Sequence, residues 1–181
     1  FLMFINQKII KFLFFFFCSN IFSSIAQTNE DVPLNNIAIN EIPKPISPII
    51  FADFSGNEIN LEDYHGKLVV INFWATWCAP CKKEMPSLDR LYQSDDFKNL
   101  QVFPVNMERP NKPKTKKFFK DLKIKKLEIY FDSELNFLKE FKVRGVPTTV
   151  LINKKGEEFA RIIGEVDFED KKFVKWLSKY D

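Results

Sequence analysis

The sequence predicts an α/β domain with three layers, in which a β-sheet lies between helices. Residues 68–73 form a nearly continuous apolar run, as expected for a strand that is covered on both faces. A helical pattern follows at residues 79–93 and a second apolar strand at residues 100–105, which together make a β-α-β unit. Further helices, two strands and a final helix complete an order that is typical of layered α/β domains.

Short extended segments precede this unit. Residues 48–54 predict a strand, which is turned by the Ser-Gly-Asn sequence that follows it. Ile59 and Leu61 predict a second short strand or its end. Residues 61–64 predict a short helical turn that ends at Gly66. We therefore expect an N-terminal β extension ahead of the main sheet.

The helix at residues 79–93 has one apolar face, formed by Met85, Leu88, Leu91 and Tyr92. Pro86 lies inside this helix. Because proline removes a backbone hydrogen bond, we expect Pro86 to kink the helix.

The second half of the chain predicts three more helices and a β-hairpin. The helices lie at residues 114–122, 133–141 and about 168–179, and the hairpin strands at residues 148–152 and 158–163. An Asn-Lys-Lys-Gly turn joins the two strands. Phe118, Phe173 and Trp176 lie on helix faces that we expect to be buried.

Residues 1–26 are typical of an export signal. Lys8 and Lys11 give the segment a positive start, a short phenylalanine-rich apolar core follows, and Ser24 and Ala26 place small residues before Gln27. We expect this leader to be cleaved or, alternatively, to remain as an N-terminal membrane anchor. Either outcome predicts an exported, periplasmic or extracytoplasmic protein, in a compartment where disulfides persist.

Two further segments complete the predicted domain organisation. Residues 27–47 are polar, contain three prolines and lack clear periodicity, which predicts a linker or an extended arm against the domain. Residues 48–181 are assigned to the α/β domain itself. A chain of this size can bury a core without disulfide staples.

Charge and motif content exclude several functions. The formal net charge is +3, of which Lys8 and Lys11 supply two, so the rest of the chain carries only +1. This balance gives no support for nucleic-acid binding. The lysine-rich stretch at residues 112–126 is interpreted as a solvated surface. Because the sequence has no Gly-x-Gly-x-x-Gly or Walker pattern, we expect no nucleotide cofactor.

The cysteines carry the chemistry. Cys18 lies in the leader, so Cys78 and Cys81 form the only pair in the rest of the chain. A lone Cys-x-x-Cys is a poor zinc site, because structural zinc needs four ligands, and we expect no resident metal. The pair follows a strand and opens a helix, an arrangement that indicates thiol-disulfide chemistry.

Position assigns different roles to the two thiols. Cys78 lies at the helix N-terminus, where free N–H groups and the helix dipole favour the thiolate, so it is the predicted attacking thiol. Cys81 lies one turn later, at a Cα distance of about 5–6 Å that suits a disulfide. It would resolve the mixed disulfide. Ala79 and Pro80 lie between them, and Pro80 preorganises the first helical turn. Trp77 is predicted to form the rim of the site or, alternatively, to be a core aromatic.

Two long stretches resemble a known family. The sequence Val70-Ile-Asn-Phe-Trp-Ala-Thr-Trp-Cys-Ala-Pro-Cys-Lys-Lys-Glu-Met-Pro86 and the later Val143-Arg-Gly-Val-Pro-Thr-Thr149 are similar to the exported TlpA/ResA-like thiol-disulfide oxidoreductases. The resemblance covers roughly residues 46–178. It implies the thioredoxin fold, with a central mixed sheet and helices on both of its faces.

The resemblance also implies roles for three further residues. Glu84 would take the proton of Cys81 during exchange, whereas the alternative is a surface charge near a helix start. Cytoplasmic thioredoxins carry an aspartate on the preceding strand, and Asn72 stands at that position here. Pro147 would form a cis-proline loop that faces the cysteines, and the Val146 backbone would pair with a substrate strand.

The favoured function is an exported thiol-disulfide oxidoreductase that reduces partner proteins. The resemblance implies targets whose cysteines await haem or copper, in cytochrome c or oxidase maturation, and a membrane thiol-reductase as electron donor. One alternative is a copper-binding module that uses Cys78, Cys81, Met85 or His65, although His65 by default is a surface turn residue. Another is a thiol peroxidase, for which Thr76 is present but Ile71 and the cysteine pair argue otherwise.

Overall fold

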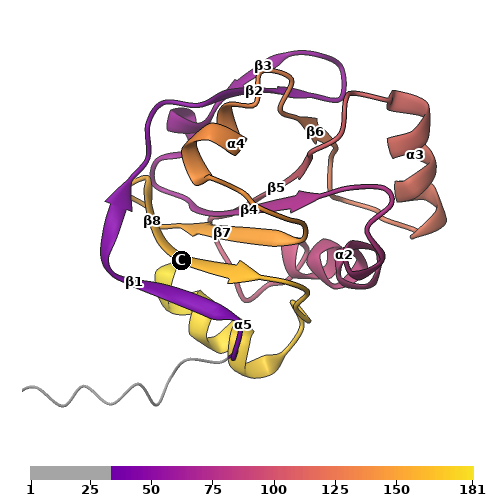
Figure 1. Cartoon of the computed structure of the whole chain (residues 1–181). Coiled ribbons are helices and arrows are strands. Elements are labelled where there is room, and N and C mark those ends of the chain that lie inside the picture. Colours follow the sequence, from indigo (N-terminus) through magenta and orange to yellow (C-terminus); the bar gives the residue numbers. More distant parts are fainter. Residues whose placement is uncertain (1–33) are drawn as a thin grey trace, which may run out of the picture. The chain divides into compact units, whose positions relative to one another are not determined.

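The computed structural model describes residues 34–181, which form an eight-stranded mixed sheet with helices packed against it (Figure 1). The strands are β1 (Ile37–Pro45), β2 (Ile50–Asp53), β3 (Glu58–Asn60), β4 (Leu68–Trp74), β5 (Leu100–Asn106), β6 (Tyr130–Phe131), β7 (Thr148–Ile152) and β8 (Glu157–Ile163). Their order across the sheet is β1-β8-β7-β4-β5-β6-β2-β3. The helices are α2 (Ala79–Tyr92), α3 (Lys112–Asp121), α4 (Asn136–Phe141) and α5 (Lys171–Leu177), with short 3₁₀ turns η1 (Leu61–Tyr64) and η2 (Ser178–Tyr180).

Strand β4 lies at the centre of the sheet. It pairs parallel with β5 and antiparallel with β7, and all seven of its residues are buried. Successive side chains of a strand point to opposite faces, so Val70 and Trp74 join one core while Ile71 and Phe73 join the other. This arrangement explains the nearly continuous apolar run from which the strand was predicted.

Helices cover both faces of the sheet, as the resemblance implies. Met85 of α2 and Phe173 of α5 belong to the same core as Val70. Phe137 of α4 and Leu61 of η1 belong to the core on the opposite face. Figure 1 shows α2 and α5 on one side of the central strands and α4 on the other. The predicted three-layer α/β architecture is therefore confirmed.

Two helices begin later than predicted. The helix expected at 133–141 begins at Asn136, because Leu135 has a left-handed backbone (φ 59°) and the Asp132 carboxylate accepts the Asn136 N–H. The helix expected from about 168 begins at Lys171, where the side chain of Asp170 caps its first N–H groups. The other predicted helices and strands are found within a few residues of their expected positions.

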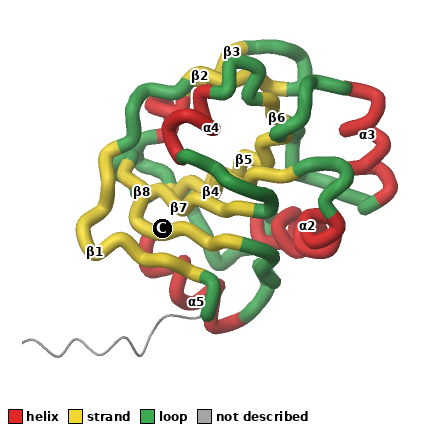
Figure 2. Tube along the Cα trace, viewed as in Figure 1, coloured by secondary structure: helices red, strands yellow, loops and turns green. Residues whose placement is uncertain are grey.

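Two strands have no counterpart in the prediction. Strand β1 lies in the segment expected to be a linker or arm, and it forms one edge of the sheet by pairing antiparallel with β8. Its prolines are tolerated because an edge strand does not need every N–H. Strand β6 is only two residues long, yet it pairs with both β5 and β2 and so joins the β2-β3 hairpin to the sheet (Figure 2).

Some predictions lie outside the described part. The proposed export signal at residues 1–26 and Cys18 precede residue 34. Within residues 34–181, no helix has the length and apolar character needed to cross a membrane. Pro86, which was expected to kink its helix, lies inside α2 without ending it.

Candidate active site

Cys78 ends the loop that follows β4 and caps helix α2. Its backbone is extended (φ −77°, ψ 108°), and its Sγ accepts the N–H of Cys81 at 3.1 Å. The two cysteines form a disulfide with a Cα distance of 5.3 Å, within the predicted range. The N–H that points at Sγ and the helix dipole would both stabilise a thiolate at Cys78 once the disulfide is reduced.

The disulfide itself is buried, but its surroundings are exposed. Cys78 is 3% exposed and Cys81 is fully buried, whereas Trp77 is 69% exposed. Ala79 and Pro80 are also exposed. The alternative that Trp77 is a core aromatic is therefore wrong. The three exposed residues that flank Cys78 form an apolar surface that is available to a partner chain.

Glu84 is a buried carboxylate on the inner face of α2. It is 2% exposed, so the alternative that it is a surface charge is wrong. Its Oε1 accepts the Nδ2 of Asn72 at 2.8 Å, and its Oε2 accepts the N–H of Val166 at 3.1 Å. Burial raises the pKa of Glu84 from 4.5 to about 7, despite the opposing effect of these two hydrogen bonds. Glu84 can therefore hold or release a proton near neutral pH.

Asn72 connects Glu84 to the sheet. Strand alternation places Asn72 on the same face as Val70 and Trp74, beneath α2. Its Nδ2 donates to Glu84 and to the Oγ1 of Thr149, at 2.8 and 3.0 Å. Because an amide does not titrate, Glu84 is the titratable member of this hydrogen-bonded pair. Thr149 belongs to the second stretch that resembles the family, but its contact with Asn72, 77 residues away, was not predicted.

A cleft connects Glu84 with the protein surface. The cleft has a volume of about 380 Å³ and lies between α2 and residues 165–169. Exposed ion pairs from Lys83 to Glu165 and from Arg90 to Glu169 link the helix to that loop. Water in the cleft would give Glu84 a route for proton exchange with solvent.

Pro147 follows a cis peptide bond, as predicted from the resemblance. Thr148 pairs with Phe73, so Pro147 lies beside the end of β4 from which the cysteine loop departs. Val146 is half-buried and packs against the core that contains both cysteines. The cis-proline loop and the disulfide therefore lie at the same edge of the sheet.

A second carboxylate, that of Glu108, makes hydrogen bonds to the loop that precedes Cys78. Glu108 follows β5, and its oxygens accept the backbone N–H of Thr76 at 2.6 Å and the Thr76 hydroxyl at 3.0 Å. Lys114 of α3 pairs with the same carboxylate at 2.7 Å. Burial alone would raise the pKa of Glu108, but the hydrogen bonds from Lys114 and Thr76 lower it to about 2. Glu108 was not predicted from the sequence, although the carboxyl ends of parallel strands meet at one edge of a sheet.

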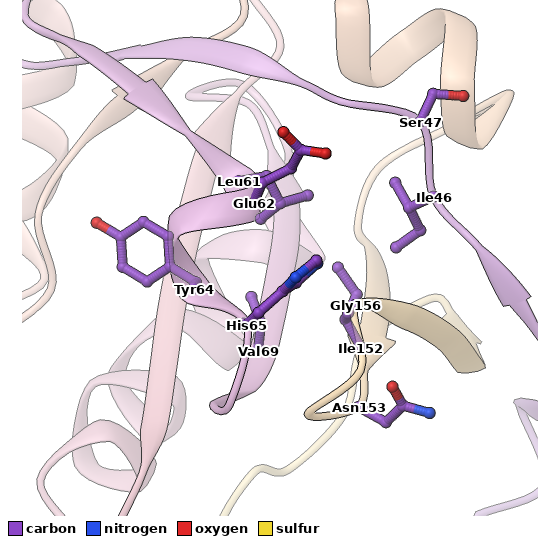
Figure 3. Close-up of a pocket in the computed structure, with 10 residues that line it drawn as sticks. All are labelled: Ile46, Ser47, Leu61, Glu62, Tyr64, His65, Val69, Ile152, Asn153 and Gly156. Atoms are coloured by element: carbon purple, nitrogen blue, oxygen red, sulfur yellow. The ribbon is translucent and has the colours of Figure 1, made fainter.

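His65 lies at the opposite end of β4. Seven strand residues separate it from the cysteine loop, a span of about 23 Å at about 3.3 Å per residue. The exposed imidazole packs on Gly156, where a Cβ would lie 2.2 Å from Nε2. Figure 3 shows His65 in a pocket of about 20 Å³, which has room for about one water.

These positions remove the support for the copper alternative. His65 is too distant to share an ion with Cys78 and Cys81, and Met85 is fully buried in the core. Residues 34–181 contain no group of three histidine, cysteine or acidic side chains that could hold a metal ion. The hydroxyl of Thr76, the residue noted for the peroxidase alternative, donates to Glu108.

Comparisons with known proteins agree with this geometry. Residues 42–157 match the AhpC/TSA family. The chain is 36% identical over 121 residues to the thiol-disulfide oxidoreductase ResA of Geobacillus kaustophilus, covering 67% of this chain and 68% of that relative. Its structure is similar to StoA from Bacillus subtilis, with TM-score 0.61, 28% identity and coverage of 74% and 98%. A DsbF homologue from Corynebacterium diphtheriae gives TM-score 0.65, 26% identity and coverage of 82% and 95%.

Proposed function

The chain belongs to the AhpC/TSA family and is a thioredoxin-fold relative of the ResA thiol-disulfide oxidoreductases, and on this premise we propose that it reduces disulfides of exported partner proteins. The observation that carries the proposal is the Cys78–Cys81 disulfide at the start of α2, with an N–H directed at the Cys78 sulfur. Neither the fold nor the family alone would assign this activity.

The proposed reaction has two exchange steps. The Cys78 thiolate attacks one sulfur of the partner disulfide, so a mixed disulfide forms and the partner's other sulfur leaves as a thiolate. The Cys81 thiolate then attacks the Cys78 sulfur, closes the Cys78–Cys81 bond and releases the second partner sulfur. Two electrons pass to the partner, which gains two thiol protons, while the protein becomes oxidised.

Glu84 is proposed to accept the proton of Cys81 before the second step. Both residues lie on the buried side of α2, one helical turn apart. The raised pKa of Glu84, about 7, suits exchange of a proton with a thiol near neutral pH. The side chains make no direct hydrogen bond, so a water molecule would carry the proton between them.

The role of Glu84 is tested by Glu84→Gln. Release of the mixed disulfide should slow by about 10²-fold or more around pH 7, because general-base contributions have that size. The first exchange step, measured as formation of the mixed disulfide, should change much less. Equal slowing of both steps would contradict the assignment and would indicate a general structural defect.

The loop at Val146 and Pro147 is proposed to receive the partner. An extended segment of the partner would lie beside the disulfide and pair with the Val146 backbone, as strands add to exposed edges. Ala79, Pro80 and Trp77 would contact the same segment, because all three are exposed around Cys78.

The cellular setting completes the proposal. The leader pattern at residues 1–26 supports export, either as a periplasmic protein or held at the membrane by an uncleaved N-terminal anchor. A membrane thiol-reductase would return the disulfide to the dithiol after each turnover. The resemblance to ResA supports targets in cytochrome c or oxidase maturation, whose cysteines must be reduced before haem or copper is attached.

Insulin reduction tests the activity. The dithiol form should reduce insulin in the presence of an excess of a small-molecule thiol, and Cys78→Ser should abolish this catalysis. Cys18→Ser is the matched control, since Cys18 lies outside the described domain, and it should retain the wild-type rate. Full activity in Cys78→Ser would refute the proposal.

A further inference from the structure

Three exposed cationic side chains near the disulfide have no ion-pair partner in the described part of the chain. Lys82, Arg109 and Arg144 are all exposed, and within residues 34–181 their side chains make no hydrogen bond or ion pair. Exposed lysines and arginines are common, so their number alone means little. Their placement around the active-site loop is the informative feature.

Each cation is tied to the site by a short stretch of chain. Lys82 directly follows Cys81, and its N–H donates to the Cys78 carbonyl. Arg109 comes two residues after Met107, whose N–H donates to the carbonyl of Trp74 at the end of β4. Arg144 comes two residues before Val146 of the cis-proline loop. Two residues span at most about 7 Å, so all three backbones lie near the loop that carries Cys78.

The acidic side chain near Arg109 and Arg144 already has hydrogen-bond and ion-pair partners. The loops at residues 107–111 and 142–146 contain one acidic residue, Glu108. Its carboxylate is bound by the backbone and hydroxyl of Thr76 and by Lys114. Glu108 therefore cannot neutralise the three cations without releasing the cysteine loop.

The other flank of α2 is different. There Lys83 pairs with Glu165, and Arg90 pairs with Glu169. The cations of that flank are matched by acids of the neighbouring loop. Within residues 34–181, Lys83 and Arg90 are thus paired with acids, whereas Lys82, Arg109 and Arg144 make no ion pair.

From this asymmetry we propose that the natural partner presents its disulfide in a segment with acidic side chains beside the cysteines and an apolar side chain over Trp77. The proposal rests on the proposed function and names the class of substrate. Trp77, which is 69% exposed next to Cys78, supplies apolar area that a partner would desolvate. The cations would draw the acidic segment toward Cys78 and select its register, because charge complementarity mainly sets encounter rate and specificity.

Two synthetic peptides test this substrate class. Both contain the same internal disulfide and the same apolar residue, and they differ only in having four Asp/Glu or four Lys/Arg residues beside the cysteines. The reduced protein should reduce the acidic peptide about tenfold faster or more at low ionic strength. The difference should shrink strongly at about 0.5 M salt, where the Debye length falls to a few Å.

Charge variants locate the effect. Lys82→Gln/Arg109→Gln/Arg144→Gln should lose most of the preference while keeping its insulin activity, and Lys82→Glu/Arg109→Glu/Arg144→Glu should reverse the preference. The matched control is Lys125→Glu/Lys126→Glu/Lys155→Glu, which changes the net charge equally at exposed positions away from the disulfide. That control should keep the preference for the acidic peptide.

The outcomes separate the two proposals. If insulin and both peptides resist reduction by the wild type, the proposed function fails. If insulin is reduced and the two peptides react at equal rates, or if the control triple variant loses the preference as fully as the site variant, the acidic-partner proposal is overturned while the oxidoreductase activity stands.

Discussion

Glu84 illustrates how burial changes the chemistry of a single residue. Its position three residues after Cys81 was visible in the sequence, but its burial and its contact with Asn72 were not. Helical spacing places a side chain on a face without specifying what lies opposite. The cysteine pair, in contrast, was predictable because its geometry depends only on a strand end and one helical turn.

The raised pKa of Glu84 makes stability depend on pH. The unfolded chain releases this proton near 4.5 and the folded chain near 7, so stability contributed by protonated Glu84 is lost as the pH rises through this window. We expect Glu84→Gln to gain up to ~3 kcal/mol over the wild type between pH 5 and pH 8, at about 1.4 kcal/mol per pKa unit. Denaturant unfolding of the oxidised proteins measures the difference in free energy of unfolding between the variant and the wild type. A difference that does not change with pH would contradict this expectation.

Glu108 acts as a positioning residue for the cysteine loop. Its carboxylate satisfies the Thr76 N–H and hydroxyl, so Glu108→Ala should lower the free energy of unfolding by about 1–3 kcal/mol. Glu41→Ala, at an exposed position of β1, is the control and should change stability little. The role of Glu108 could not be predicted from the sequence, because its partner Thr76 is 32 residues away. An unchanged midpoint of denaturation in Glu108→Ala would show that the cysteine loop does not depend on Glu108 for its stability.

At the level of elements, strongly patterned segments were predictable and weakly patterned ones were not. Strand β4 has seven buried residues, which leaves a clear apolar run in the sequence. Strand β1 is an edge strand with mixed burial and prolines, so it carries little periodicity. Strand β6 has two residues and exists only through its pairing with β5 and β2. Such strands are determined by tertiary contacts rather than by local sequence.

Strand β1 provides a test at this scale. A chain that begins at residue 46 loses β1 and exposes the edge of β8, whereas a chain that begins at residue 34 keeps it. We expect the shorter chain to be less stable by at least about 2 kcal/mol, since several ladder hydrogen bonds disappear. Thermal unfolding compares the two chains. Equal melting temperatures would show that β1 contributes nothing to the domain.

At the level of the domain at residues 34–181, the chemistry gathers at one edge of the sheet. The disulfide follows β4, Glu108 follows β5, and Pro147 precedes β7, whose first residue pairs with the end of β4. The family resemblance anticipated the cysteines and the proline at this edge. The distribution of charge around it could not be predicted, because it depends on which acids are already paired within the fold.

The proposed reaction requires that Cys78 attacks a partner disulfide and that Cys81 resolves the product. Mass spectrometry of the reduced Cys81→Ser variant, mixed with a protein that contains a disulfide, tests it most directly. We expect a covalent complex joined through Cys78 that a reducing agent separates, and no such complex for Cys78→Ser. A complex that forms through Cys81 in Cys78→Ser, with none through Cys78 in Cys81→Ser, would contradict the account.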